Sequence, residues 1–375
     1  MALILTLWVL AALIVLAGGL AVMVRTETQT SRNFADLTRC RWAAKAGVNS
    51  GTGDLADLGA QMNSLSLTLS SEDEQIDLGD ASFETTIEDE AGKMNLNTAP
   101  PDVLEALFDS REIADCIIDW RDEDDTPGSQ GAETDHYLAL PTPYRCKNAP
   151  FDTVRELLLV KGVTNELLST PVTSNGRTLE GMLTVYSRDN NLTNGGEKRI
   201  DIRTAGKEEL KSILGQILTD EEIDAIVSRR TTGTNQSAGS AADVLRGANV
   251  PREKIQRVYD LVTNSNETTR PGLVNINTGP VEVLAVLPGL NSGMAEEIVS
   301  YRTANGAFVD VGALLQVSAV TDEAFARSAD LLTARSSVFK IVSVGRLAPG
   351  WSSCTITCVA DATGGNAAQI KYWRE

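Results

Sequence analysis

The hydrophobic pattern divides the chain into one apolar segment and a long polar remainder. Residues 1–24 carry no charged side chain, and the run stops at Arg25. As a helix rising 1.5 Å per residue, this segment would extend about 36 Å, enough to cross a hydrocarbon core of about 30 Å. No second apolar run of comparable length follows. The pattern therefore predicts one transmembrane anchor, residues 1–24, that carries a single large soluble region.

Beyond the anchor the pattern stays helical and then changes to alternation. Positions at three-to-four spacing predict a helix with one modest apolar face, formed by Phe34, Leu37, Arg41, Ala44 and Val48. The glycines of residues 51–53 are expected to weaken or end this helix. Alternating apolar and polar residues then predict two half-buried strands, residues 64–70 and 81–89.

The C-terminal end returns to strand patterns. Three β-rich runs, residues 338–344, 354–360 and 367–373, are separated by turn signals. Strands near both ends with helices between them predict an α+β fold. A long N-terminal helix would pack on an antiparallel sheet, with residues 25–92 and 334–375 forming one sheet domain. A large all-α insertion, residues 93–333, would interrupt that sheet.

The insertion is internally repetitive. Three similar hexapeptides begin at Asn95, Asp201 and Asn275, and each precedes an apolar-periodic helix. A second amphipathic helix then closes each copy on an arginine, at Arg121, Arg230 and Arg302. Residues 151–164 and 308–321 extend the match between the first and last copies. The copies therefore predict three units that resemble helix–hairpin–helix motifs.

Threonines stand where the first helix of each copy should begin. Thr98, Thr204 and Thr278 are expected to be N-caps, with Pro100 and Pro280 just inside two of the helices. Helices that start this way present backbone N–H groups, which nucleic-acid phosphates can use.

Charge argues against nucleic acid as the ligand. The chain has 51 acidic and 33 basic residues, a net charge of −18, which repels phosphate. Only the last copy has a suitable hairpin, residues 289–293, and Glu296 and Glu297 follow it. We therefore expect these helical units to serve packing and protein contact, with no nucleic acid bound.

A loop in the first copy is strongly acidic. Seven carboxylates lie within residues 119–135, and Gly128 and Gly131 would let the loop fold back. Clustered carboxylates repel one another unless a cation gathers them, and calcium takes 6–8 oxygen ligands from such loops. Calcium is favoured over magnesium, which keeps more water, and over zinc, which rarely binds carboxylates alone. The alternative is a solvated acidic turn.

Catalytic patterns are missing from the sequence. The chain has one histidine, His136, and no phosphate loop or nucleotide fingerprint, so we expect no enzyme activity. Its five cysteines are too few for a disulfide scaffold. Cys116 and Cys146 bracket the acidic loop, and whether they form a disulfide stays open. Cys354 and Cys358 would lie about 13 Å apart along a strand, too far to bridge.

Taken together, these features resemble the K-type minor pseudopilins of the type II secretion system. The resemblance rests on the uncharged N-terminal helix, the flanking strands and a set of local motifs. These motifs are Asn95-Leu-Asn-Thr-Ala-Pro, Asp119-Trp-Arg-Asp-Glu-Asp-Asp125, Gly131-Ala-Glu133, Asn148-Ala-Pro-Phe151, Val274-Asn-Ile-Asn-Thr278 and the terminal Tyr372-Trp-Arg-Glu375. They are distributed over essentially the whole chain.

The resemblance implies that residues 25–92 and 334–375 form a pilin-like domain, and it also implies a location, partners and a metal. It implies a single pass through the bacterial inner membrane, with the soluble region in the periplasm. The implied partners are the I-type and J-type minor pseudopilins in a tip complex that starts the pseudopilus, together with the major pseudopilin. It also implies calcium in the insertion, which maps best onto Asp119, Asp122, Asp124, Glu133 and Asp135.

Two features leave alternatives open. Basic residues follow the anchor, beginning at Arg25, and none precedes it, which taken alone would keep the soluble region in the cytoplasm. That conflict disappears if a basic leader has been removed. The alternative function is a membrane-tethered DNA receptor built on helix–hairpin–helix copies, which would bind duplexes in a salt-dependent way.

Overall fold

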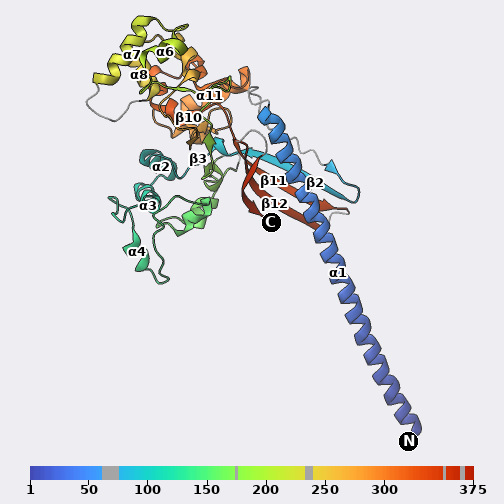
Figure 1. Ribbon diagram of the computed structural model, residues 1–375. Coiled ribbons are helices and arrows are strands. Elements are labelled where there is room, and N and C mark those ends of the chain that lie inside the picture. Colours follow the sequence, from blue (N-terminus) through green and yellow to red (C-terminus); the bar gives the residue numbers. More distant parts are fainter. Residues whose placement is uncertain (61–75, 174–175, 233–239, 349–351, 364–367) are drawn as a thin grey trace.

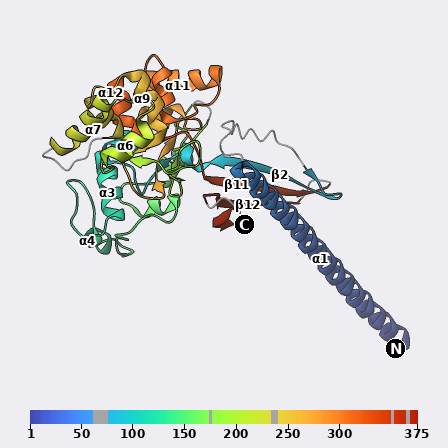
Figure 2. The ribbon, with the colours of Figure 1, turned by 45° about the horizontal axis from the view of Figure 1, so that its top comes forward.

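A computed structural model describes residues 1–60, 76–173, 176–232, 240–348, 352–363 and 368–375. A long N-terminal helix runs along one face of an antiparallel sheet and extends far beyond it (Figure 1). A helical insertion lies at the end of the sheet away from the N-terminus, and a second view shows the same arrangement (Figure 2). The fold is mixed α+β, as the sequence predicts.

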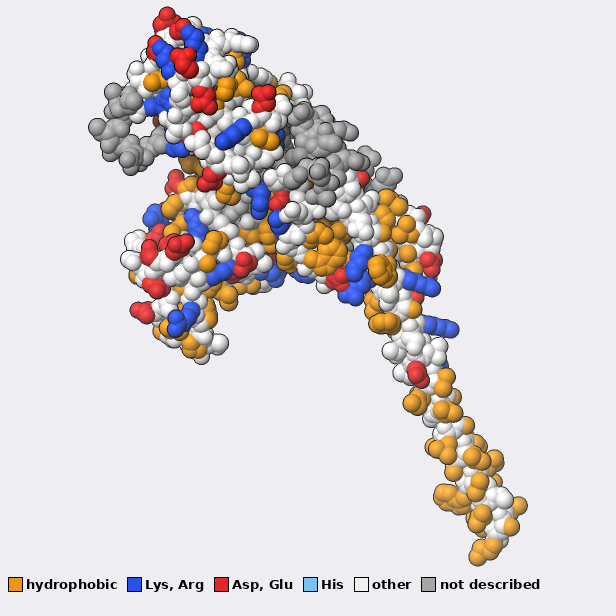
Figure 3. Space-filling view, viewed as in Figure 1, with side chains coloured by type: hydrophobic (Ala, Val, Ile, Leu, Met, Phe, Trp, Pro, Cys, Tyr) orange, Lys and Arg blue, Asp and Glu red, His pale blue; other side chains and the backbone are white. Residues whose placement is uncertain are grey.

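Helix α1 (Ala2–Ala60) combines the anchor with part of the soluble region. Its 59 residues correspond to a length of about 90 Å. Among the described residues, this is the one helix long and apolar enough to cross a membrane, with a mean hydropathy of 2.7 over its best window. No residue of that window is buried, and Figure 3 shows apolar side chains covering the visible face of this part of α1.

The expected break at residues 51–53 does not occur, because the sheet supports the helix there. Gly51 is buried, and a Cβ on it would lie 3.3 Å from side-chain atoms of Ile341 and Thr85. Tertiary packing of this kind overrides the low helix propensity of glycine.

The predicted apolar face of α1 is divided in two. Ala44 and Val48 are buried against the sheet, and Cys40 and Ala43 join them. Phe34 and Leu37 are exposed, because α1 meets the sheet only from Cys40 onward. The sheet therefore covers only the second half of the predicted apolar face.

The sheet has the order β1-β2-β11-β12-β13, and every neighbouring pair is antiparallel. Its strands are β1 (Ile76–Asp77), β2 (Ala81–Asp89), β11 (Val338–Leu347), β12 (Ser352–Asp361) and β13 (Gln369–Arg374). The described strands agree with four of the predicted segments. The predicted strand 64–70 lies outside the described residues.

The insertion leaves and re-enters the sheet between two neighbouring strands. β2 ends at Asp89, which pairs with Phe339 at the start of β11. Asp89 is buried and accepts hydrogen bonds from Ala91 N at 2.7 Å and Asn275 Nδ2 at 3.0 Å. It also accepts from the hydroxyls of Thr278 and Ser336. One carboxylate thus connects the sheet to the last helical unit.

We expect Asp89→Ala to lower the free energy of unfolding by about 2 kcal/mol, because it leaves several buried donors without an acceptor. Chemical denaturation of the full-length protein in detergent measures this change. Asp80→Ala is the control, since Asp80 pairs with Arg39 at an exposed site where ion pairs contribute little. Equal stability of the two variants would contradict the role assigned to Asp89.

Each sequence copy folds into a compact unit closed by a two-residue parallel strand pair. The first unit contains β3 (Met94–Asn95), α2 (Pro101–Phe108), α3 (Arg111–Arg121), α4 (Thr134–Leu138), α5 (Asn165–Ser169) and β4 (Leu183–Thr184). The second contains β6 (Ile200–Asp201), α6 (Lys207–Leu214), α7 (Asp220–Thr232), α8 (Ala241–Gly247), α9 (Arg252–Val258) and β7 (Val262–Thr263). The third contains β9 (Val274–Asn275), α10 (Val281–Ala285), α11 (Ser292–Asn305), α12 (Asp322–Ser328) and β10 (Leu332–Thr333).

Short elements complete the insertion. β5 (Arg188–Asp189) pairs with β8 (Arg270–Pro271) between the units. The described residues also form short 3-10 turns. η1 (Glu90–Gly92) lies just before the insertion, and those within it are η2 (Val154–Leu159), η3 (Glu180–Met182), η4 (Tyr259–Leu261), η5 (Val311–Gln316) and η6 (Ala329–Leu331). Buried apolar residues from all three units belong to one contiguous cluster, separate from the cluster under α1.

The repeated hexapeptide is explained by its side-chain hydrogen bonds. In the first copy, Asn95 Oδ1 accepts from Asn97 N at 2.9 Å, which forms a tight Asx turn. The Asn97 amide then pairs with the backbone of Phe151, accepting at 2.7 Å and donating at 3.0 Å. Asn277 makes the same two bonds with Phe308 in the third copy.

The predicted N-caps were displaced by two residues. The cap positions of α2, α6 and α10 are Pro100, Gly206 and Pro280, and none makes a side-chain capping bond. The threonines instead lie within the preceding turns, where the Asx geometry organises the backbone.

The arginine that closes each copy returns to the loop before its first helix. Arg121 donates to the carbonyl oxygens of Leu96 and Ala99, the latter at 2.8 Å. Arg230 and Arg302 donate to Ala205 O at 2.9 Å and Ile276 O at 2.5 Å. Each arginine therefore ties the end of its second helix to the start of its unit.

Candidate metal centre

The acidic loop is attached to one face of helix α3. Asp115 and Asp119, one turn apart, are buried and point into the loop. Asp119 accepts from Gly128 N at 3.0 Å, and Asp115 accepts from Gln130 N at 3.1 Å. Ser129 Oγ also donates to Asp115, at 2.9 Å. Carboxylates on a regular helix thus hold a loop that has no regular structure of its own.

One glycine of the loop permits a close approach. A Cβ on Gly131 would lie 1.8 Å from Asp119 Oδ2, so any larger residue would displace the carboxylate. Glu133, two residues later, is thereby brought beside Asp119.

Three of the five predicted ligands converge. Asp119, Asp122 and Glu133 each offer a carboxylate oxygen, and these oxygens lie within 4.8 Å of one another. Asp122 Oδ1 and both oxygens of Glu133 are buried without a hydrogen-bond partner. Buried polar atoms are normally satisfied, and a bound cation would supply a partner for these three oxygens.

The electrostatics of the three groups agree with this need. Burial raises the pKa of Glu133 from its ordinary 4.5 to about 7, opposed by the neighbouring Cys146 thiol and reinforced by the charge of Asp119. Burial also raises the pKa of Asp119 and of Asp122, and Asp124 raises both further. A bound cation would reverse these shifts by favouring the charged forms.

The other two predicted ligands lie differently. Asp124 is exposed, and its Oδ1 accepts from Thr126 N at 2.7 Å, although its charge still acts on Asp119 and Asp122. Asp135 is exposed in α4 and does not join the three converging carboxylates.

Buried aromatic residues pack beside the loop and anchor it. Trp120 and Tyr137 are buried with ring centroids 5.2 Å apart, whereas Leu138, which also borders the loop, is exposed. Asn148 was missed as a loop residue. Its Nδ2 donates to Asp124 O at 2.6 Å and to Asp125 Oδ1 at 3.0 Å, and its Oδ1 is buried without a partner.

The donor set fits a hard cation. It consists of carboxylate oxygens, with no histidine and with the Cys116 and Cys146 thiols kept protonated by burial, which raises their pKa to about 11 and about 12. Both cysteines are unpaired in the structure. Oxygen-only ligand sets suit calcium or magnesium and do not suit zinc.

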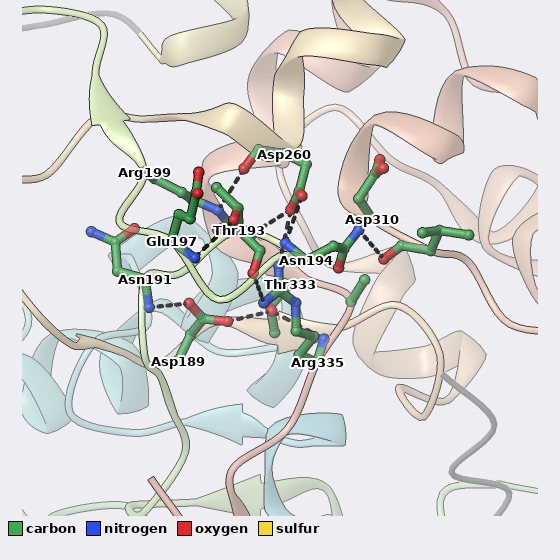
Figure 4. Close-up of polar contacts among 12 residues, drawn as sticks. Asp189, Asn191, Thr193, Asn194, Glu197, Arg199, Asp260, Asp310, Thr333 and Arg335 are labelled. Atoms are coloured by element: carbon green, nitrogen blue, oxygen red, sulfur yellow. Dashed lines mark hydrogen bonds and ion pairs between the residues drawn. The ribbon is translucent and has the colours of Figure 1, made fainter. Parts of the chain in front are cut away.

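A second group of carboxylates contains the buried Asp189 and the partly buried Asp260, and Asp260 is paired with two arginines. Figure 4 shows Arg199 and Arg335 both directed at Asp260, with distances of 3.2 Å and 2.9 Å to its Oδ1. Asp189 accepts from Thr333 Oγ1 at 2.8 Å. These contacts connect the second unit with the end of the third, and the two arginines balance the charge of Asp260.

The hairpin of the third unit has no charge suited to phosphate. Asn291 caps α11 by accepting from Met294 N at 3.0 Å, so one helix-end donor is already used. Glu296 and Glu297 are exposed one turn further on.

Fold and site together define a class: a pilin-like subunit with an exposed apolar helix and an acidic, helical insertion. The family model for type II secretion system protein K matches residues 101–170, and the model for the helix-hairpin-helix motif matches residues 271–333. Type II secretion system protein K from Pectobacterium carotovorum subsp. carotovorum is 40% identical over 58 residues. That alignment covers 16% of this chain and 18% of the relative.

A solved structure extends the likeness to the whole fold. A chain from the crystal structure of the GspK–GspI–GspJ complex of the enterotoxigenic Escherichia coli type 2 secretion system matches with a TM-score of 0.53. The match covers 93% of this chain and 98% of that chain, at 15% identity. The chain is therefore similar to protein K of the type II secretion system over part of its first helical unit, and its overall fold is similar to that of a chain in the GspK–GspI–GspJ complex. Within the described part of the chain, α1 is the helix long and apolar enough to serve as a membrane anchor.

Proposed function

We propose that this chain is the tip subunit of a type II secretion pseudopilus. In this role the chain would act in assembly. Together with I-type and J-type minor pseudopilins, it would nucleate the filament that exports folded proteins across the outer membrane. The observation that carries this proposal is the near-complete match to a chain from the GspK–GspI–GspJ complex. The local matches to protein K of the type II secretion system also support a structural component over an enzyme.

The first turns of α1 beyond the anchor supply the surface for partner helices. Phe34, Leu37 and Trp42 are 73%, 53% and 65% exposed. Large apolar side chains are seldom left together in water unless a partner covers them, and Arg39 and Arg41 lie among them. Because the sheet covers α1 only from Cys40 onward, a neighbouring pseudopilin helix has room to pack there.

The insertion would be placed in the periplasm and ordered by calcium. The anchor passes directly into α1, and the acidic loop lies at the outer side of the insertion, away from α1 in both views (Figures 1 and 2). In that position a metal at Asp119, Asp122 and Glu133 would stabilise the insertion without touching the partner surface of the helix. The metal therefore has a structural role in this proposal.

A pair of charge-introducing variants tests the partner surface. We expect Phe34→Asp with Leu37→Asp to weaken co-purification with I-type and J-type minor pseudopilins at least about tenfold, because burying two carboxylates in a helix interface is costly. Val309→Asp is the matched control, since Val309 is 54% exposed on the insertion, far from α1 in sequence. Undiminished binding by the double variant would remove α1 from the interface.

Deletion tests the function itself. Without this chain, pseudopilus number and secretion of folded cargo should both fall. Unchanged pseudopili and unchanged secretion in the deletion strain would overturn the proposal.

A further inference from the structure

Two cysteines from opposite ends of the chain lie on facing surfaces of the pilin-like domain. Cys40 belongs to α1 and is completely buried, and Cys354 belongs to β12 and is half-buried. The Cys40 thiol donates to Ser352 O at 3.1 Å, so its sulfur lies over β12 two residues from Cys354. Neither residue contributes to the candidate metal centre.

The register of the sheet places Cys354 under α1. Cys354 pairs directly with Gly345 on β11, and directly opposed residues project from the same face. A Cβ on Gly345 would lie 2.1 Å from Cys40 O and 2.6 Å from Ala44 N, so that face is covered by α1 at Cys40. Opposed Cβ atoms are about 5 Å apart, which brings the Cys354 side chain beside Cys40.

The packing further along the helix is consistent with this placement. Ala44, Val48, Ile356 and Cys358 share one buried cluster between α1 and the sheet. Cys40 lies one helical turn before Ala44, a distance of about 6 Å. Cys354 lies two residues before Ile356 on the strand, a distance of about 6.6 Å. The two thiols also interact electrostatically: burial raises the pKa of Cys40, and the Cys354 thiol raises it further.

We propose that Cys40 and Cys354 form a disulfide that joins the anchor helix to the C-terminal part of the sheet. The proposal rests on the proposed function in one respect, because disulfides persist in an oxidising compartment such as the periplasm. Cys358 is not the partner of Cys354, because β12 is continuous from Ser352 to Asp361 and separates the two by about 13 Å.

The chemistry is thiol–disulfide exchange with an oxidant that is itself a disulfide, such as the disulfide form of an oxidoreductase or oxidised glutathione. The accessible Cys354 thiolate attacks one sulfur of the oxidant and forms a mixed disulfide, releasing a thiolate. The Cys40 thiolate then attacks Cys354 Sγ and displaces the second thiol of the oxidant. The two cysteines lose two protons and two electrons, and the oxidant becomes a dithiol or two thiols.

The consequence is mechanical as well as thermodynamic. The bond would close a loop containing β2, the whole insertion and β11, and cross-links over long loops restrict the unfolded chain most. It would also hold the anchor helix on the sheet when force is applied along α1.

Peptide mapping of the full-length protein in detergent tests the geometry. The protein is equilibrated in oxidised and reduced glutathione, blocked with an alkylating reagent, digested and analysed by mass spectrometry without reduction. We expect a peptide cross-linked through Cys40 and Cys354 in the oxidised sample, lost in Cys354→Ser and kept in Cys358→Ser. We also expect the melting temperature to be higher in the oxidised sample, by roughly 5 °C.

The outcomes separate this proposal from the proposed function. Free, alkylated Cys40 and Cys354 in the oxidised sample would overturn the disulfide and leave the tip function untouched. An acid trap of whole cells, followed by the same mapping, tests the compartment. A cross-link that forms in the glutathione buffer but is missing in cells would count against the periplasmic location on which the proposal rests.

Discussion

We expect calcium to raise the melting temperature of the full-length protein in detergent by roughly 5 °C, and magnesium to raise it less. A ligand present at 100-fold excess over its Kd stabilises the folded state by about 2.7 kcal/mol, if it binds only that state. The expected binding energy comes from Asp122 Oδ1 and the two Glu133 oxygens, which are buried without hydrogen bonds. Thermal unfolding with calcium, with magnesium and with excess chelator measures the effect.

Substitutions at the site separate binding from general charge effects. Asp122→Ala and Glu133→Ala should each abolish the calcium-dependent shift, because each removes one of three converging carboxylates. Glu166→Ala is the control, since Glu166 is exposed elsewhere in the insertion. If chelator and calcium give the same melting temperature for the unsubstituted protein, the acidic loop is a solvated turn.

The pH dependence of this shift follows from Glu133. Its pKa in the metal-free fold, about 7, lies above its ordinary 4.5, so the folded state holds this proton more tightly than the unfolded state. Its contribution to metal-free stability is therefore complete below pH 4.5 and is lost as pH rises to about 7. Calcium competes with the same proton, so the calcium-induced shift should be larger at about pH 8 than at about pH 5. A shift that shrinks with rising pH would contradict the role of Glu133.

Gly345→Ala should be among the most destabilising single substitutions in the pilin-like domain, at about 3 kcal/mol. The new Cβ would lie 2.1 Å and 2.6 Å from backbone atoms of α1, at Cys40 O and Ala44 N. Backbone atoms of a packed helix cannot rotate away as a side chain can, so α1 and the sheet must separate. Chemical denaturation monitored in detergent gives the change.

The same helix supplies a matched glycine. A Cβ on Gly53 meets nothing within 4 Å, and Gly53 is exposed within α1. Gly53→Ala should leave the protein unchanged or stabilise it by up to about 1 kcal/mol, because alanine favours helix. Similar stabilities of the two alanine variants would mean that α1 does not lie against β11 as described.

The local sequence pattern was sufficient to predict the three helical units, but it was less reliable for the exact residues at which their helices begin. The hexapeptides at Asn95 and Asn275 predicted the start of helical units, since the Asx turns they form involve residues only two positions apart. The helix starts were misplaced at Thr98 and Thr278, because a threonine before an apolar run satisfies the N-cap pattern whether or not it caps. The bond from Asn97 to Phe151 could not be predicted, since nothing local links those two residues.

For the acidic loop, too, the sequence predicted the segment but not the arrangement of its side chains. Composition alone predicted residues 119–135 to be a cation-binding segment, because like charges at short spacing repel. Which of its carboxylates converge depends on how the loop folds back onto α3, and Asp135 was misplaced because its neighbours form α4. Asn148 approaches from a distant segment, and its only sequence signal was the family-like Asn148-Ala-Pro-Phe151.

By itself the sequence determined the apolar anchor, the strand segments, the helical units and the acidic loop. Each of these depends on the periodicity or charge of neighbouring residues, which chain position alone specifies. The tertiary structure decided that α1 continues through Gly51, that Phe34 and Leu37 stay exposed, and which three carboxylates meet. It also placed Cys40 beside Cys354. These features depend on contacts between segments far apart in the chain, and the energy of such contacts is defined only once the sheet has brought those segments together.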